Sequence, residues 1–560
     1  MLKNFLKMSV AVALTAAASL QVHAQSVKLQ IVGSSAFFLE AGLGANLSTG
    51  PIDAACVWSA SSGVTATDAT VSPSAVDSGS AWVAWTTGTG GSCTSPASNA
   101  VIYAYLNTDS VVGNRCLFNG CTLTYPTTDP APAGLILTGG VADCGTTGEC
   151  DLPEVIATKL NAQVTNVAAT DIRPEDAEFA IARALATPCG GAIGTTQYLG
   201  LGYSNGGIIN SAIPGSTKKF NVVAFKLPAT APNVTVVGAT AVLFAVHSSN
   251  DANGFATDSN ITSTALAHYL DGTTNTTPGG EAANVLLREP LSGTYNTVEY
   301  NVTNTTALAT SQDVGKNQPA AQRNCILSGG VEVANPTLKF TAANGAERLR
   351  AIGTGEELTE VGAFTNANTT DNNNNLGYGF WSVANYASLG KVTHTGYYTV
   401  DGVDPLNSTS TSCKYSGVIP TTGTSELACV DMHNVANGSY PVYSLLRMVN
   451  TSTAISSTVS SLASAAQDFV SFGTDTSRPD FIRPSSMTTI REHFTPPLGL
   501  SGSTYPSTNT DGDKQFTTRT ACTALPEAGG DVGGVVVTLS ANSTWCTNNA
   551  NTHGQTGGRR

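Results

Sequence analysis

Short apolar segments and small polar turns alternate along most of this chain. Val27–Val32 alternates like a strand and leads through Gly33-Ser34-Ser35-Ala36 into the helix-like segment Phe37–Leu43. The same order recurs where the apolar segment Val167–Thr170 precedes Pro174–Leu185, which opens with proline and two acidic residues, as helices often do. This order predicts an α/β architecture with a largely parallel sheet, in which ligands lie at the carboxyl ends of strands.

The remaining hydrophobic pattern predicts further short elements. Strands are expected at Ala81–Trp85, Ala100–Leu106, Asn221–Ala224, Val285–Leu287 and Gly377–Trp381, with a buried strand pair in Val234–Val246. Helices are expected at Leu152–Val164, Ser263–Leu270, Ser382–Ala387 and Ala454–Phe472. Loop is expected over Cys116–Cys150 and in the Thr-, Ser-, Asn- and Gly-rich sequence after about Pro496.

The first 25 residues have the pattern of a secretory signal. Lys3 and Lys7 precede the apolar run Met8–Leu20, and Val22-His23-Ala24 provides a small-x-small cleavage site. The mature chain is therefore expected to begin near Gln25 and to be periplasmic or secreted. No later apolar run approaches the roughly 20 residues of a membrane span, so none is expected.

All twelve cysteines follow that segment, which fits an oxidising compartment. Metal binding is the alternative use of cysteine, but the sequence has no CxxC pair and its remaining histidines are scattered, so we expect neither a metal site nor a cofactor. Spacing leaves the connectivity open. The plausible pairs are Cys56 with Cys93, Cys116 with Cys121, Cys144 with Cys150, Cys413 with Cys429 and Cys522 with Cys546, leaving Cys189 and Cys325.

The formal charge of −13 becomes −15 when the two signal lysines are removed, because the first 25 residues contain no acidic side chain. Nucleic acid is therefore excluded as a partner. A small anion is not excluded, because donors at short range in a desolvated site outweigh a distant and salt-screened net charge.

The segment Arg288-Glu289-Pro290-Leu291-Ser292-Gly293-Thr294 is suited to binding a tetrahedral oxyanion. Arginine supplies a charged fork of N–H donors, the two hydroxyls are rotatable donors, and glycine lets backbone N–H groups approach a ligand. A helix beginning near Tyr295 would direct its positive end to the same point. In a chain rich in Ser, Gly and Thr, such a turn also arises by chance.

Taken in order, these landmarks resemble the phosphate-binding protein of bacterial ABC uptake systems, a member of the type 2 periplasmic binding protein superfamily. The resemblance extends over some 400 residues. It is carried by Gly33-Ser34-Ser35-Ala36, Thr170-Asp171, Leu266–Gly272, Arg288 with Ser292-Gly293-Thr294, Leu376-Gly377-Tyr378 and Tyr440-Pro441, with Ser61-Ser62-Gly63 as a loose counterpart of the family's Ser-Gly loop.

The resemblance implies two α/β lobes joined by crossover strands. Lobe one would comprise residues 26–188 and a returning part at 391–495, and lobe two residues 189–390, followed by a loop-rich tail at 496–560. This chain is longer than ordinary phosphate binders of that family, and the excess is expected as insertions near 93–150, near 296–351 and at the C-terminus.

The resemblance also implies the ligand and the residues that bind it. Inorganic phosphate or a similar oxyanion would be held between Arg288, Ser292, Gly293 and Thr294 of one lobe and Ser34, Ser35, Ala36 and Asp171 of the other, and the expected partner is an ABC transporter permease. Asp171 would accept a hydrogen bond from protonated phosphate and repel sulfate, which has no proton to give. Capping the following helix is its alternative role.

Two other functions remain open from the sequence. Hydrogen-bond donors that bind phosphate would also suit an exported phosphatase-like hydrolase. However, no histidine spacing indicates a base or a metal site, and no catalytic residue is assigned. The polar composition and the disulfide complement also fit a surface structural or adhesive protein on a binding-protein scaffold.

Overall fold

The computed structural model describes most of the chain between Gln25 and Met487. The described residues are 25–71, 74–137, 144, 148–185, 203–228, 230, 232–247, 253–255, 260–303, 312, 325–328, 331–334, 339–365, 374–384, 394–406, 417, 419, 427–440, 442–470, 480–487, 489–491 and 536–538. The expected signal, the expected lobe boundaries near 188 and 390, and nearly all of the expected tail lie outside them.

One sheet of thirteen strands runs through the molecule. Its order is β14 (Lys339–Thr341), β15 (Glu347–Ala351), β11 (Asn284–Arg288), β16 (Asn375–Phe380), β9 (Asn233–His247), β19 (Tyr443–Asn450), β6 (Val167–Thr170), β1 (Ser26–Gly33), β4 (Val101–Asn107), β3 (Ala75–Trp85), β2 (Cys56–Asp68) and β5 (Thr122–Thr124), and β17 (Thr395–Tyr397) also pairs with β9.

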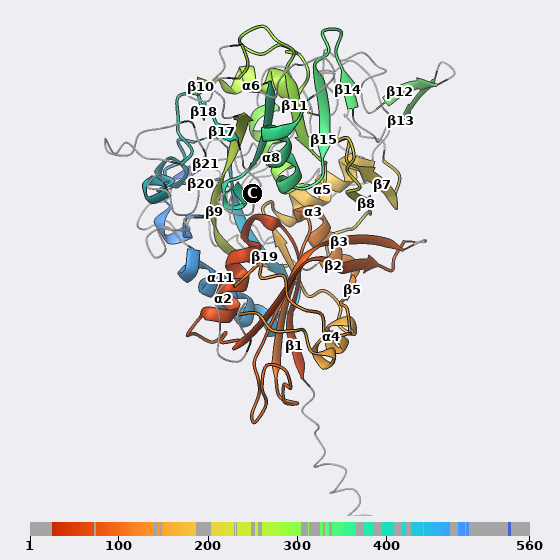
Figure 1. The fold of residues 1–560 in the computed structure, drawn as a ribbon, viewed down its shortest axis with the longest axis vertical. Helices are drawn as coiled ribbons and strands as arrows, with labels where there is room; N and C mark the ends of the chain where they lie inside the picture. The colour runs from red at the N-terminus through yellow and green to blue at the C-terminus, as the bar shows by residue number, and fades with distance from the viewer. Residues whose placement is uncertain are drawn as a thin grey trace, which may run out of the picture.

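The long strand β9 connects two lobes. From Asn233 to Ala241 it pairs with β19, and from Val242 to Val246 it pairs with β16, antiparallel in both cases. Strands β1 to β6 and β19 therefore form lobe one, whereas β11 and β14 to β17 form lobe two. In Figure 1 the strands of lobe one occupy the lower half and those of lobe two the upper half. The expected fold class, a two-lobed α/β protein with disulfides, is confirmed.

The expectation of a largely parallel sheet is only partly right. In lobe one β1 is parallel to β4 and β6, and in lobe two β11 is parallel to β15 and β16. Strands β2, β3, β9 and β19 pair antiparallel. The β-branched run in β9, expected as a strand pair, is one continuous strand that changes partner midway.

Helices cover the sheet and join its strands. Lobe one carries α2 (Phe38–Leu47), α3 (Ser110–Asn119), α4 (Glu154–Asn161), α5 (Pro174–Leu185) and α11 (Thr453–Val470). The later helices are α6 (Ser263–Leu270), α7 (Gly293–Val298), α8 (Thr354–Ala363), α9 (Trp381–Ala384) and α10 (His433–Ala436), with a π-helical turn at Glu299–Thr303 and 3₁₀ turns at Ser35–Phe37, Leu427–Cys429 and Pro484–Ser486. In the part of the chain that the structure describes, no helix is long and apolar enough to cross a bilayer.

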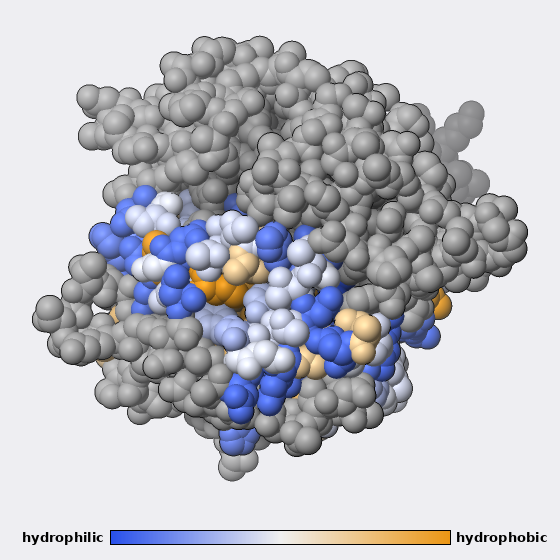
Figure 2. All heavy atoms as spheres, turned by 90° about the horizontal axis from the view of Figure 1, so that it is seen from above, coloured by the Kyte–Doolittle hydropathy of each residue, from blue (hydrophilic) through white to orange (hydrophobic). Residues whose placement is uncertain are grey.

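Among the described residues, four small two-stranded sheets lie outside the main sheet. They pair β7 (Gly207–Asn210) with β8 (Lys219–Val222), β10 (Asn260–Ile261) with β18 (Thr399–Val400), β12 (Cys325–Ser328) with β13 (Val331–Ala334), and β20 (Thr489–Arg491) with β21 (Val536–Thr538). Figure 2 shows that hydrophilic side chains predominate among the described residues seen from above, with a group of hydrophobic ones near the centre and a few others scattered around it.

Close packing of α3 on the sheet sets the position of its first turn. A side chain at Gly113 would bring its Cβ within 2.5 Å of the Val32 carbonyl oxygen, so only glycine lets the helix lie directly on β1. The sequence predicted loop from Cys116 onward, whereas Cys116 is a buried residue of this helix, and β5 joins the main sheet. Likewise, β15 at the end of the expected insertion near 296–351 is a main-sheet strand parallel to β11.

Three of the expected disulfides are present: Cys56–Cys93, Cys116–Cys121 and Cys144–Cys150. Cys429 is also disulfide-bonded, but its expected partner Cys413 lies outside the described residues, as do Cys189, Cys522 and Cys546. The Sγ atoms of Cys56, Cys93 and Cys150 lie within 4.8 Å of one another, and the disulfides account for this group.

Candidate functional site

Three parallel strands of lobe one end at the same edge of the sheet. In the strand register, Gly33 at the end of β1 is paired with Asn107 of β4 on one side and with Ala169 of β6 on the other. The residues that follow these strands, Ser34, Asp109 and Asp171, are all buried. The carboxyl ends of β1, β4 and β6 thus provide lobe one's part of the candidate site.

The turn after β1 is held by hydrogen bonds from its neighbours. Ser34 donates its backbone N–H to the Ala169 carbonyl at 2.9 Å, and its Oγ accepts from the N–H of Ala36 at 3.1 Å. The Tyr105 hydroxyl donates to the Ser34 carbonyl. Ser34 and Ala36 are buried, whereas Ser35 is half-buried. This turn therefore offers one buried hydroxyl beside Asp171.

The loop after β11 provides lobe two's part of the candidate site. Arg288 is the last residue of that strand, and Ser292 is the N-cap of α7, accepting from the Tyr295 N–H at 3.2 Å. Arg288, Ser292 and Thr294 are each no more than 2% exposed. The hydroxyl of Ser292 accepts a hydrogen bond for the cap and keeps its own proton for donation.

Gly293 lies directly against Asp171 of the other lobe. A Cβ at Gly293 would be 2.1 Å from the Asp171 Oδ1 atom, closer than two atoms can approach without a bond, so this position requires glycine. The N–H of Val111 in α3 also donates to the Leu291 carbonyl at 3.2 Å. The structure thus brings together the candidate residues of the two lobes. That they bind a ligand stays a prediction.

The Asp171 carboxyl group is buried, but hydrogen bonds satisfy only part of it. Its backbone N–H donates to Ser110 Oγ at 3.1 Å, but its Oδ1 is buried and has no hydrogen-bond partner. Burial raises the pKa of Asp171 to about 7, although a hydrogen bond from its own backbone, the charges of Arg288 and Arg447, and a hydrogen bond from Ser34 oppose the rise. An unpaired buried acceptor is costly, which makes Oδ1 a good acceptor for a ligand's proton.

Arg288 is surrounded by acceptors from both lobes. Its Nε and Nη2 donate to the carboxylate of Glu289 at 3.3 and 3.0 Å, and Nη2 also donates to Asp109 Oδ1 of lobe one at 2.7 Å. Its Nη1 donates to the hydroxyl of Thr354 in α8. Burial alone would lower the pKa of Arg288, but the adjacent Glu289 and Asp109 carboxyls raise it overall, so the guanidinium is charged.

The carboxyl groups around Arg288 differ in how firmly they hold protons. Burial raises the pKa of Asp109, and the charge of Glu289 beside it adds to the rise. The pKa of Glu289 is lowered, because the charge of Arg288 and hydrogen bonds from Asp109 and Arg288 outweigh its burial. Burial also raises the pKa of Glu357 in α8. Glu289 is therefore the permanent counter-ion of the arginine.

Sequence reasoning missed Asp109 and the turn that carries it. Ser61, Ser62 and Gly63, expected at the site, lie exposed within β2, so that expectation is wrong; the turn that reaches Arg288 is Thr108-Asp109-Ser110, after β4. The signal was available: the predicted strand Ala100–Leu106 precedes a small polar turn, as at the two other sites. The expectation of a cysteine-bearing loop hid the helix that begins at Ser110.

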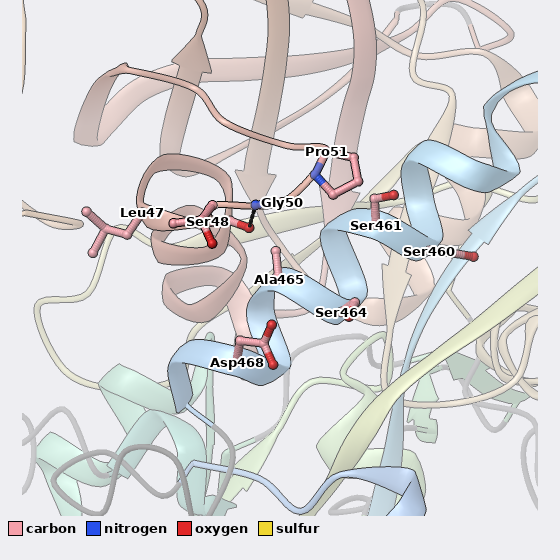
Figure 3. A pocket seen from close by; sticks show the side chains of 10 residues that line it. Leu47, Ser48, Gly50, Pro51, Ser460, Ser461, Ser464, Ala465 and Asp468 are labelled. Carbon is pink, nitrogen blue, oxygen red and sulfur yellow. Dashed lines mark hydrogen bonds between the residues drawn. The ribbon is translucent and has the colours of Figure 1, made fainter.

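A surface pocket of about 480 Å³ lies apart from these residues, between the end of α2 and α11 in lobe one. Figure 3 shows its lining, in which Ser460, Ser461 and Ser464 come from α11 and the turn at Ser48 and Gly50 faces them. Its one charged lining residue, Asp468, pairs with Arg483 at 3.3 Å. The pocket lining thus contains no cationic side chain, whereas the interlobe site contains Arg288.

No family model and no curated protein matches the chain. Solved structures with a distant likeness include three phosphate binders. The phosphate-binding protein of Stenotrophomonas maltophilia is 15% identical over 58% of this chain and 79% of that one, with a TM-score of 0.28. An ABC-type phosphate transport receptor from Vibrio cholerae is 13% identical over 43% and 68%, with a TM-score of 0.23.

The ancestral soluble variant of the human phosphate-binding protein is 11% identical over 68% of this chain and 92% of that one, with a TM-score of 0.26. Likeness at this level concerns the fold alone and adds no argument about a ligand. The case for the site rests on its geometry.

Proposed function

We propose that this protein is an exported solute-binding protein that captures an oxyanion, with inorganic phosphate as the preferred ligand, between its two lobes. The observation that carries the proposal is the contact of Gly293 with Asp171. It places a loop of hydroxyl, backbone and guanidinium donors from lobe two against a buried, unpaired carboxylate oxygen of lobe one. We further propose that an ABC permease receives the ligand.

The chemistry of the site favours an oxyanion that carries a proton. Hydroxyls of Ser292 and Thr294 and a backbone loop can donate to several oxygens, as a tetrahedral anion requires. Asp171 Oδ1 needs a donor, which phosphate supplies and sulfate does not. The same arrangement lacks an assigned nucleophile and base, so we propose binding rather than hydrolysis.

Titration calorimetry on residues 25–560 at neutral pH tests this proposal. The protein should bind phosphate more tightly than sulfate, and Asp171→Asn should reduce that preference, because an amide can donate to sulfate. Arg288→Lys should weaken phosphate binding at least about tenfold, since lysine keeps the charge but lacks the paired N–H donors of a guanidinium. Arg483→Lys, whose pairing is with the exposed Asp468, is the matched control.

Absence of binding to any oxyanion would refute the proposal. Binding with unchanged phosphate preference in Asp171→Asn would remove that residue from the site. Release of phosphate from a chromogenic ester, lost in the Arg288 variant, would instead favour the hydrolase.

A further inference from the structure

We propose that Asp109 is a built-in competitor of the ligand: its carboxyl group binds Arg288 across the lobes, and an incoming anion takes its place on the guanidinium. The inference rests on the proposed function and adds a residue that sets its affinity. The contact is direct, because Arg288 Nη2 lies 2.7 Å from Asp109 Oδ1, and the Asp109 side chain is only 8% exposed.

The Asp109 side chain is not oriented as the N-cap of the helix that follows it. Asp109 is the N-cap residue of α3, where an aspartate ordinarily accepts a hydrogen bond from the first turn of its own helix. Here the side chain makes no capping hydrogen bond. The carboxyl group has instead turned toward the arginine of the other lobe.

The donors of Arg288 are nearly all in use while Asp109 is bound. A guanidinium has five N–H groups. Two donate to Glu289, one to Asp109 and one to Thr354, which leaves a single N–H for a ligand. A bidentate grip on an oxyanion needs two. Release of Asp109 provides the second.

Asp109 is the acceptor that can leave. Glu289 adjoins Arg288 in sequence and accepts from two of its nitrogens, so it stays with the arginine. The charged groups facing the pair from other elements are Glu357 of α8, beside Arg288, and Asp171 after β6, beside Asp109. Once displaced, the Asp109 carboxyl group can accept from the first turn of α3, whose N–H groups are the usual donors to an N-cap side chain, apart from that of Val111, which donates to Leu291.

The exchange also affects how the lobes are held. With Asp109 on Arg288, an ion pair joins the lobes in addition to the hydrogen bond from Val111 to Leu291. With an anion on Arg288, the ligand itself bridges the lobes. Removing the carboxyl group of Asp109 should therefore strengthen anion binding. Without an anion, it should also weaken the attachment of the two lobes to each other.

Two variants test the inference with inorganic phosphate as the probe. Asp109→Asn keeps the shape and an acceptor oxygen but removes the carboxyl group that forms the ion pair with Arg288. Asp109→Ser removes the carboxyl group and keeps a good N-cap for α3, so it guards against a folding defect. Calorimetry should show phosphate affinity raised about tenfold in each, whereas the exposed control Asp53→Asn should equal the wild type.

Small-angle scattering gives an independent reading. Without phosphate, both Asp109 variants should have a larger radius of gyration than the wild type, and saturating phosphate should abolish the difference. If the wild type binds phosphate and neither variant binds more tightly, the inference is overturned and the proposed function stands. If only the variants bind, the inference is supported. If none of the proteins binds phosphate, the proposed function fails, and the inference fails with it.

Discussion

At the scale of single residues, the candidate site depends on Gly293 having no side chain. Glycine is required there by space rather than by backbone conformation, since the atom that a Cβ would meet belongs to Asp171. A side chain at this position must push apart the loop after β11 and the turn after β6. The packing of the two lobes and the geometry of the site are therefore set by the same residue.

Gly293→Ala should weaken phosphate binding by about a hundredfold or more. It should also lower the free energy of unfolding by about 1–3 kcal/mol, because a methyl group is forced into a closely packed contact. Calorimetry and urea unfolding measure the two effects. Gly50→Ala, at an exposed turn, should change neither. Wild-type affinity in Gly293→Ala would show that the two segments do not meet around the ligand.

Asp171 should leave a signature in the pH dependence of stability. Its pKa is raised to about 7 in the folded chain, against about 4 in an unfolded one. Between those values only the folded chain keeps the proton, so stabilisation present at pH 4 is lost progressively up to pH 7.

Asp171→Asn does not titrate at this position. Its unfolding free energy, relative to the wild type, should rise by on the order of 4 kcal/mol from pH 4 to pH 7 and then level off. Urea unfolding in phosphate-free buffers measures this difference. A difference that stays constant over the range would mean that Asp171 is not buried as described.

At the scale of elements, α3 connects the sheet of lobe one with the candidate site. Gly113 lets it lie on β1, and its N-cap residue reaches the arginine of lobe two. Gly113→Ala should therefore displace the helix, lower the free energy of unfolding by about 1–3 kcal/mol, and weaken phosphate binding as Ser110, whose Oγ accepts from the Asp171 N–H, moves. Urea unfolding and calorimetry test both; a stability loss with wild-type affinity would separate the helix from the site.

The sequence predicts the bounds of an element well where residues typical of helix or strand ends mark them. Val167–Thr170, Pro174–Leu185 and Ser263–Leu270 were predicted with the bounds observed, because proline, acidic residues or a polar cap mark their ends. Helix α3 was missed, since glycine, asparagine and cysteine interrupt its apolar pattern and it is buried on most sides. The partner exchange within β9 leaves no local signal, because it is a property of the tertiary fold.

The candidate residues likewise divide into those that the sequence predicts and those that it does not. The sequence predicts Arg288 at the end of a strand, and Ser292, Gly293 and Asp171 in clear turns after strands. Asp109 and Thr354 reach Arg288 only through the packing of separate elements. Thr354 has no neighbouring motif that could have identified it, whereas Asp109 lies in a small polar turn after the predicted strand Ala100–Leu106.

At the scale of the molecule, the Cys56–Cys93 disulfide includes none of the candidate-site residues in the segment that it closes. Cys56–Cys93 closes a loop across 37 residues of sequence at the β2 and β3 side of lobe one. Replacing both cysteines with alanine should lower the free energy of unfolding by about 4 kcal/mol through the entropy of the unfolded chain. Phosphate affinity should be unchanged; a large loss of affinity would mean that this part of the lobe shapes the site.

The continuity of β9 has a consequence for heat denaturation. Because each lobe hydrogen-bonds a different half of one strand, melting of either lobe frays the segment on which the other depends. The two halves should therefore lose structure together, and a calorimetric scan should trace one endotherm rather than two.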